Sequence, residues 1–387
     1  MLLALFIYGL TGGGATRRVI TLAEGWARRG HEVRLLVVRP EGPLYERVRK
    51  GPLKLVPLDF GPLDPLLKKL PRRQQIFLSR WPLARYLRQE PPEIFLSAAN
   101  HVHLVSLSAR KKSREDIPLV LRVSNHIRAS LTQKKGLKAL KGRLRLHFLK
   151  KNLSQADFIV AVSQGVLEDL LTLVPFPPQK TSVIYNPIDV KEIQRLAAQP
   201  VSHPWLREKK YPVVLGAGRL SAQKDFSTLL RAFAILRQRH PARLIILGEG
   251  KQRRKLEDLA LKLGIREDVD LPGFSPNPWA YMARSDLFVL SSKWEGLPGV
   301  LLEALAVGCP VVSTDCPSGP REILKQGRLG PLVPVGDSKA LAQAMEKVLK
   351  APPPRELLIA RAKDFDVEKA VEAYLAVFEK VRKRHVP

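Results

Sequence analysis

The first forty residues alternate apolar and polar segments in an order typical of a parallel α/β sheet. Leu2–Tyr8 is almost wholly apolar and predicts a buried strand, and the glycine-rich Gly9–Gly14 follows it. In Arg17–Arg29 the apolar residues recur at steps of three, four and seven, which places them on one face of a helix. Val33–Val38 is again mostly apolar, as expected for a strand covered on both faces.

A second cycle of the same kind begins near the middle of the chain. Pro212–Ala217 predicts a strand, Gly218–Lys224 a loop, Asp225–Arg239 a helix and Arg243–Leu247 another buried strand. Further short strands are expected at Ile94–Ser97, Leu119–Val123, Phe158–Val162, Asp286–Leu290 and Pro310–Ser313. Two sets of strands alternating with helices predict an α/β fold with two doubly wound parallel sheets.

The domain boundary is expected near Tyr185–Pro187. The polar, proline-containing stretch from there to about Tyr211 has the composition of a linker. This divides the chain into domains of residues 1–187 and 188–366. Val367–Val381 then has the apolar spacing of a last helix.

Charge narrows the classes of partner. The 387 residues include 65 Lys and Arg against 36 Asp and Glu, a net charge of +29, and residues 1–190 hold 32 of the basic and 14 of the acidic residues. Anionic lipid, phosphate groups or nucleic acid could bind such a surface. The alternative is that the excess of basic residues reflects a generally basic proteome. Leu66–Arg88 and Lys134–Lys151 interleave cations with apolar residues. This favours helices lying on an anionic membrane surface; ordinary amphipathic helices with a solvated basic face are the alternative.

The expected location is the cytoplasm, peripheral to the inner face of the cell membrane. Met1–Leu10 is apolar but lacks a basic start, so a signal peptide is not expected. No apolar run approaches the roughly 18 residues that span a bilayer. Cys309 and Cys316 have no metal-ligand spacing, and so few thiols suggest a reducing compartment.

Two glycine-containing loops follow predicted strands and could receive phosphate. Gly12, Gly13 and Gly14 permit close approach of a ligand to the backbone before a helix; a tight strand–helix turn is the alternative. After Gly218, Arg219 and Lys224 lie five residues apart. Both could reach a diphosphate and stabilise it as a leaving group, whereas the alternative is solvated charge at a helix start.

A third loop, Trp294–Gly299, contains Leu297, Pro298 and Gly299 and leads into a helix that carries Glu303. Glu303 lies in an apolar stretch, where a carboxylate needs a partner such as the hydroxyls of a ribose. Glu295 could turn into the same pocket. Structural salt bridges are the alternative for both carboxylates.

Together these loops resemble the family-4 retaining glycosyltransferases of the GT-B fold, over almost the whole chain. Glu295 to Glu303 matches the family's E-x7-E element. The other matching segments, in chain order, are Asn186–Asp189, Gly218–Asp225 and Gly248–Gly250. The stretch Thr314–Ile323 is similar to bacterial members that extend lipid-linked oligosaccharides and capsular or O-antigen glycans.

The resemblance implies two Rossmann-like domains facing a cleft, with the acceptor bound by residues 1–187 and the nucleotide sugar by 188–366. The terminal helix, 367–387, would pack back onto the first domain. The implied roles are diphosphate binding for Arg219 and Lys224, ribose binding for Glu303, and contact with the transferred sugar for Glu295. Phe274 would border the base, Gly218 would lie in the diphosphate loop, Leu297, Pro298 and Gly299 would offer backbone amides, and Gly12–Gly14 would close on the donor.

Two positions on the acceptor side stand out against the family pattern. Where close relatives often carry a glutamate in G-G-A-E-R, this chain has Thr16. His126, just after the strand Leu119–Val123, is a candidate for the catalytic histidine of many relatives. A structural or solvated histidine is the alternative.

The expected activity is transfer of a hexosyl or N-acetylhexosaminyl group from a nucleotide sugar to a membrane-associated, polyprenyl-diphosphate-linked glycan. The donor expected from the resemblance is a UDP-sugar. No Asp-x-Asp site is evident in a suitable loop, so no metal and no cofactor are expected. A nucleotide-sugar epimerase or a glycogen- or sucrose-type synthase is the alternative within the fold. A nucleic-acid-binding protein is not expected, because no binding module is recognisable and aromatic residues make up 6% of the chain.

Overall fold

The chain folds into two compact units in the computed structural model, which describes residues 1–132, 147–148 and 150–385. One unit comprises Met1–Pro187 together with the segment from Val367 onward, and the other is Ile188–Asp366. These are the ranges expected from the sequence, while the acceptor and donor roles given to them stay predictions.

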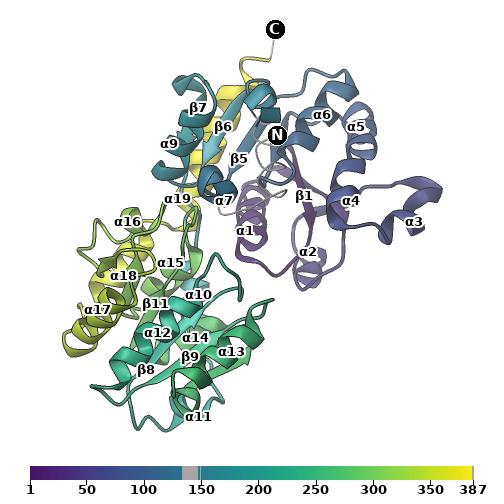
Figure 1. Ribbon diagram of the computed structural model, residues 1–387. Coiled ribbons are helices and arrows are strands. Elements are labelled where there is room, and N and C mark those ends of the chain that lie inside the picture. Colours follow the sequence, from purple (N-terminus) through teal and green to yellow (C-terminus); the bar gives the residue numbers. More distant parts are fainter. Residues whose placement is uncertain (133–146, 149, 386–387) are drawn as a thin grey trace. The chain divides into compact units, whose positions relative to one another are not determined.

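The first unit is built on a parallel sheet (Figure 1). Its described strands are β1 (Leu2–Gly9), β2 (Glu32–Arg39), β3 (Lys54–Pro57), β4 (Ile94–Ser97), β5 (Leu119–Val123), β6 (Phe158–Ala161) and β7 (Thr181–Val183). Their order in the sheet is β3-β2-β1-β4-β5-β6-β7. Buried residues on both faces of β1 and of β4 to β6 explain their continuous apolar sequences.

Helices and short 3₁₀ turns connect these strands. They are α1 (Gly14–Arg28), α2 (Tyr45–Lys50), η1 (Gly61–Leu63), α3 (Asp64–Lys68), α4 (Arg72–Leu78), α5 (Arg80–Gln89), α6 (His103–Ser113), α7 (Ile127–Thr132), α9 (Gln164–Leu173), η2 (Pro178–Lys180) and α19 (Val367–Arg382). Leu66–Arg88, expected to be helical, forms three short helices, α3, α4 and α5, rather than a continuous one. Pro71 disfavours a helical residue before it, and Pro82 lacks the N–H that would bond to the end of α4. The basic segment Lys134–Lys151 falls mostly outside the described residues.

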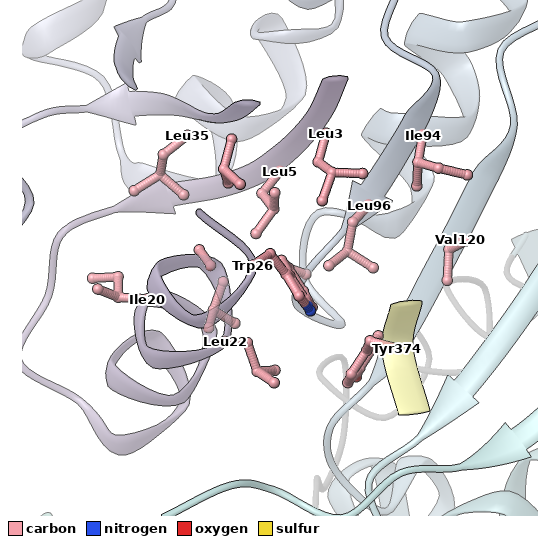
Figure 2. Close-up of a cluster of buried hydrophobic side chains, with 14 of the residues drawn as sticks. Leu3, Leu5, Ile20, Leu22, Trp26, Leu35, Ile94, Leu96, Val120 and Tyr374 are labelled. Atoms are coloured by element: carbon pink, nitrogen blue, oxygen red, sulfur yellow. The ribbon is translucent and has the colours of Figure 1, made fainter. Parts of the chain in front are cut away.

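The last helix, α19, completes the core of the first unit. Trp26 on α1 is fully buried, and its ring centroid lies 5.4 Å from that of Tyr374 and 5.1 Å from that of Phe378. Figure 2 shows Trp26 among side chains of the β strands, with Tyr374 beside it. At the surface Arg29 is ion-paired with Glu368, at 2.6 Å. Residues more than 340 positions apart therefore share one hydrophobic core.

The second unit repeats the architecture with a smaller parallel sheet. Its described strands are β8 (Val213–Ala217), β9 (Arg243–Leu247), β10 (Val269–Gly273), β11 (Leu287–Leu290), β12 (Val311–Thr314) and β13 (Leu332–Val333), in the order β10-β9-β8-β11-β12-β13. The helices are α10 (Val190–Ala197), α11 (Pro204–Arg207), α12 (Phe226–Arg237), α13 (Arg253–Lys262), η3 (Arg266–Asp268), α14 (Pro278–Arg284), α15 (Gly299–Ala306), α16 (Pro320–Ile323), α17 (Ser338–Lys350) and α18 (Arg355–Lys363).

The linker expected after Pro187 is in fact part of the second unit. Asp189 accepts a hydrogen bond from the Glu192 N–H, 2.9 Å, and thereby caps α10. Val190, Ile193 and Ala197 then bury one face of this helix. Within the residues that the structure describes, no helix is both long and apolar enough to cross a bilayer.

The strand order locates the ligand-binding edge of each sheet. It reverses between β1 and β4 in the first unit and between β8 and β11 in the second. In open parallel sheets ligands bind outside the carboxyl ends of the strands at such a switch point. The segments that follow β1, β4, β8 and β11 are therefore where binding residues are expected.

Candidate active site

The loops that follow β8 and β11 are joined by hydrogen bonds at the switch point of the second sheet. The Lys293 N–H donates to the Gln223 carbonyl, 2.8 Å, and Gln223 Nε2 donates to the Trp294 carbonyl, 2.9 Å. Ser291 Oγ donates to the Lys224 carbonyl, 2.8 Å. Two segments about 70 residues apart in sequence thus form one connected loop structure.

Lys224 and Glu295 meet within this structure. Lys224 Nζ lies 2.6 Å from Glu295 Oε1, and Ser292 Oγ donates to the same oxygen at 2.6 Å. The two charged side chains are 17% and 9% exposed. An ammonium group has three N–H donors, so Lys224 can keep this pair and still bind an anion. No described residue is bonded to Glu295 Oε2, which leaves that oxygen for a ligand donor.

Glycines bring neighbouring loops into contact around Lys224. Gly218 has φ 151° and Gly248 φ 135°. A Cβ on Gly218 would lie 3.1 Å from Lys224 Cε, and one on Gly248 would lie 2.0 Å from the Gly218 carbonyl oxygen. Arg219 is exposed beside them, and within the described residues it has no ion-pair partner. The packing therefore fixes the backbone tightly but leaves one cation facing solvent.

Glu303 is buried near the start of α15. It is 6% exposed, and Leu301, Leu302 and Ala304 around it are wholly buried. Pro298 precedes the helix, and Leu297 and Pro298 are buried while Gly299 is partly exposed. The Glu295 N–H donates to the Pro317 carbonyl at 3.2 Å, so the loop after β12 supports this segment.

The remaining donor-side candidate is Phe274, directly after β10. Its side chain is 59% exposed, unlike most large apolar residues of this unit. It follows Gly273, whose carbonyl accepts the Gly248 N–H at 2.7 Å. Phe274 thus lies at the same edge of the sheet as the loops after β8 and β9, where an exposed ring could stack on a base.

The first unit contains the other two candidates. Gly12–Gly14 connects β1 to α1, with Gly13 as a helix N-cap that has no side-chain cap. Thr16 Oγ1 lies 3.0 Å from Thr11 Oγ1. A Cβ on Gly14 would meet no heavy atom within 4 Å, so steric crowding in this structure does not require glycine there.

His126 lies in the turn between β5 and α7. Its Nδ1 lies 3.2 Å from both the Ala129 amide nitrogen and Asp169 Oδ2. Burial lowers the pKa of His126, Asp169 opposes that effect and Arg128 adds to it. These contacts hold the ring through Nδ1, so Nε2 is the nitrogen that can face a substrate.

Asp169, on α9, holds this turn in place and was missed by the sequence analysis. Its Oδ2 accepts the N–H groups of Ile127, 2.6 Å, and Arg128, 3.1 Å, and lies 3.2 Å from His126 Nδ1. Asn100 adds a second support, since its Oδ1 accepts the Ser124 N–H at 2.7 Å. Neither residue belongs to a motif, so no local signal marked them.

The structure brings some of the predicted residues together. Gly218, Arg219, Lys224 and Glu295 belong to adjoining loops of the second unit, which also holds the candidates from residues 274 and 297–303. Gly12–Gly14 and His126 belong to the first unit. The individual roles given to all of them stay predictions.

The carboxylates of Asp268 and Asp270 each have a side-chain partner. Asp268 is ion-paired with Arg237, 2.6 Å, and Asp270 Oδ2 lies 2.9 Å from His203 Nε2. Among the described residues no group of three His, Cys, Asp or Glu side chains is arranged to hold a metal ion. Metal-independent activity stays a prediction for experiment.

Comparison with known proteins decides the family. The family described as Glycosyltransferase Family 4 matches residues 12–192, and that described as Glycosyl transferases group 1 matches residues 201–365. A Campylobacter jejuni protein, named N-acetylgalactosamine-N,N'-diacetylbacillosaminyl-diphospho-undecaprenol 4-alpha-N-acetylgalactosaminyltransferase, is 31% identical over 90% of this chain and 90% of its own. The chain belongs to the family-4 glycosyltransferases.

Other relatives agree with this assignment. The Salmonella typhimurium lipopolysaccharide 1,6-galactosyltransferase is 31% identical to this glycosyltransferase over 62% of the chain and 67% of its own length. HepE of Anabaena, solved with UDP and glucose, is 20% identical with a TM-score of 0.75, over 98% of this chain and 99% of its own. The predicted GT-B fold and the prediction of a glycosyltransferase enzyme are thereby confirmed.

Proposed function

We propose that this glycosyltransferase transfers a hexosyl or N-acetylhexosaminyl group, with retention of anomeric configuration, from a nucleotide sugar to a polyprenyl-diphosphate-linked glycan. The observation that carries the proposal is the Lys224–Glu295 ion pair at the switch point, with Arg219 exposed beside it. The acceptor class is supported by the Campylobacter jejuni relative, whose name contains diphospho-undecaprenol. UDP is the nucleotide of the donor expected from the family resemblance.

In the proposed mechanism the leaving diphosphate is stabilised by fixed positive charge. Arg219 and Lys224 donate to its oxygens, and Glu295 holds the Lys224 ammonium while its second oxygen contacts the transferred sugar. The acceptor hydroxyl attacks from the face that the diphosphate leaves, and a phosphate oxygen takes its proton. The protein supplies position and charge, which are the main sources of catalysis in such transfers.

A membrane-associated acceptor requires the enzyme to work at a lipid surface, and the first unit carries a suitable patch. Phe77 and Trp81 are 52% and 47% exposed, on α4 and α5. The Arg80 guanidinium lies 3.8 Å from the centroid of each ring. We name Phe77, Arg80 and Trp81 the aromatic–arginine patch. Rings and cations in this arrangement favour the interface of an anionic membrane on its cytoplasmic side.

Ligand binding and turnover test the proposal directly. Thermal shift should detect binding of one class among UDP-, GDP- and ADP-sugars, and Glu303→Gln should weaken that binding. Transfer should persist in excess EDTA. Turnover abolished by EDTA and restored only by added metal would exclude the metal-independent mechanism. Retention is checked by NMR of the anomeric proton of the product.

A further inference from the structure

Two arginines, a tyrosine and a histidine gather at the switch point of the first sheet, apart from the residues discussed above. Arg39 is the last residue of β2, Tyr8 lies near the end of β1, and His101 follows β4. Arg72 begins α4, which contacts the same edge through the hydrogen bonds of Gln75 to Tyr8 and Arg39. These elements flank the reversal between β1 and β4, where a doubly wound sheet binds its ligand.

A buried amide holds Arg39 in place. Gln75 Oε1 accepts hydrogen bonds from Arg39 Nε and from the Tyr8 hydroxyl, each at 2.9 Å. Gln75 Nε2 donates to the Leu70 carbonyl, 2.7 Å, which fixes the orientation of the amide. The Arg39 side chain is 12% exposed, and its Nη2 is buried without a hydrogen-bond partner among the described residues. An orphaned guanidinium N–H is costly unless a ligand accepts from it.

Arg72 is held by a different pair of contacts. Its guanidinium carbon lies 4.4 Å from the centroid of the Tyr8 ring, and its Nη2 lies 3.1 Å from His101 Nε2. Stacking uses the face of the guanidinium, so its remaining edge N–H groups can donate. The acidic group paired with this cluster is Asp64, whose Oδ1 lies 3.7 Å from Arg39 Nη1. Within the described part of the chain, two guanidinium groups facing the Asp64 carboxylate leave a positive excess.

We infer that Arg39 and Arg72, the latter held by His101, form an anion site that binds the diphosphate of the lipid-linked acceptor. Planar guanidinium groups match phosphate oxygens in pairs, and two of them suit a diphosphate. The assignment to the acceptor rests on the proposed function and on α4 itself. Phe77 of the aromatic–arginine patch lies five residues after Arg72 on this helix, which is about 8 Å along its axis. The diphosphate of a polyprenyl lipid lies at the membrane surface, within such a distance of the apolar chain.

The test uses geranyl diphosphate, a short and water-soluble polyprenyl diphosphate, with binding measured by titration calorimetry. Arg72→Ala should weaken its binding about tenfold or more, the scale of one charge-assisted contact. Arg73→Ala is the matched control, because Arg73 is exposed and adjacent on α4. It should leave the affinity nearly unchanged. Arg39→Gln should also weaken binding, and thermal melting of each variant checks that it is folded.

Further ligands separate the possible sources of the anion. Inorganic diphosphate should compete with geranyl diphosphate, geraniol should not, and UDP should bind native and Arg72→Ala protein equally. Loss of UDP affinity in Arg72→Ala would assign the site to the donor and overturn the inference. Failure of the native chain to bind geranyl diphosphate, or an equal loss in Arg73→Ala, would also overturn it. If UDP-sugars fail to bind while the geranyl diphosphate results hold, the proposed function fails and the anion site stands.

Discussion

Lys224 Nζ and Glu295 Oε1 lie 2.6 Å apart, and the two residues come from loops that follow neighbouring strands, β8 and β11. The pair is mostly buried, so its orientation is set before a ligand arrives. A positive group already in place stabilises a leaving group without the cost of reorganisation. The contact therefore has direct consequences for turnover.

Lys224→Ala should lower kcat by about 100-fold, the scale of losing one preorganised charge partner. Lys224→Arg keeps the charge and should retain part of the turnover. Lys255→Ala, which removes an exposed lysine from α13, is the control and should match the native enzyme. Steady-state kinetics measure the effect, and native turnover in a folded Lys224→Ala variant would contradict the role.

Removing the aromatic–arginine patch should release the enzyme from anionic membranes. Phe77→Ser with Trp81→Ser should abolish flotation with phosphatidylglycerol vesicles at low salt, because both apolar rings are lost and Arg80 alone provides no apolar anchor. Leu261→Ser is the control, since Leu261 is 69% exposed on α13 of the other unit. Unchanged flotation of the double variant, or no flotation of the native protein, would remove the patch from the membrane contact.

Asp169→Asn should move the acid side of the pH–rate profile to lower pH. The Asp169 carboxylate raises the pKa of His126 against the lowering caused by burial and by Arg128. Without that charge the pKa of His126 falls further, so the neutral ring persists to lower pH. Measurement of kcat/KM across pH tests this, with Glu168→Gln on the same helix as the control. If the acid limb of the profile does not shift, protonation of His126 does not control kcat/KM.

Trp26→Ala should destabilise the first unit by about 3–5 kcal/mol, as expected for removing a large side chain from a core. Trp26 is fully buried and packs edge-on against two rings of α19. Trp81→Ala is the exposed counterpart and should cost little, about 0.5 kcal/mol or less. Urea unfolding gives both values. Similar midpoints for the two variants would contradict the structural role of Trp26.

Strands buried on both faces were predictable from their sequences. Ile94–Ser97 and Leu119–Val123 have the bounds that their apolar runs indicate. The short β7, Thr181–Val183, was missed because its half-exposed residues lack an apolar run. The short helix α10 was assigned to a linker, although Val190, Ile193 and Ala197 have helical spacing. Its surrounding polar residues and prolines outweighed that signal.

The residues of the candidate site were likewise only partly predictable from the sequence. Gly218 through Lys224, and Glu295 with Glu303, were identified because their spacing along the chain is itself the pattern. Asp169 lies 43 residues from His126, and Gln75 lies 36 residues from Arg39. Such pairs depend on how helices pack onto the sheet. No single stretch of sequence records that packing.

The return of α19 to the first unit has a consequence for how the protein is made. Residues 1–187 are synthesised first, but their core includes Tyr374 and Phe378, which are synthesised only after the whole of the second unit. The segment Ile188–Asp366 is continuous and contains its own core. The continuous unit can therefore fold without α19, whereas the first unit keeps part of its apolar surface open until α19 has been made. Chaperone contact during synthesis should accordingly concentrate on the first 187 residues.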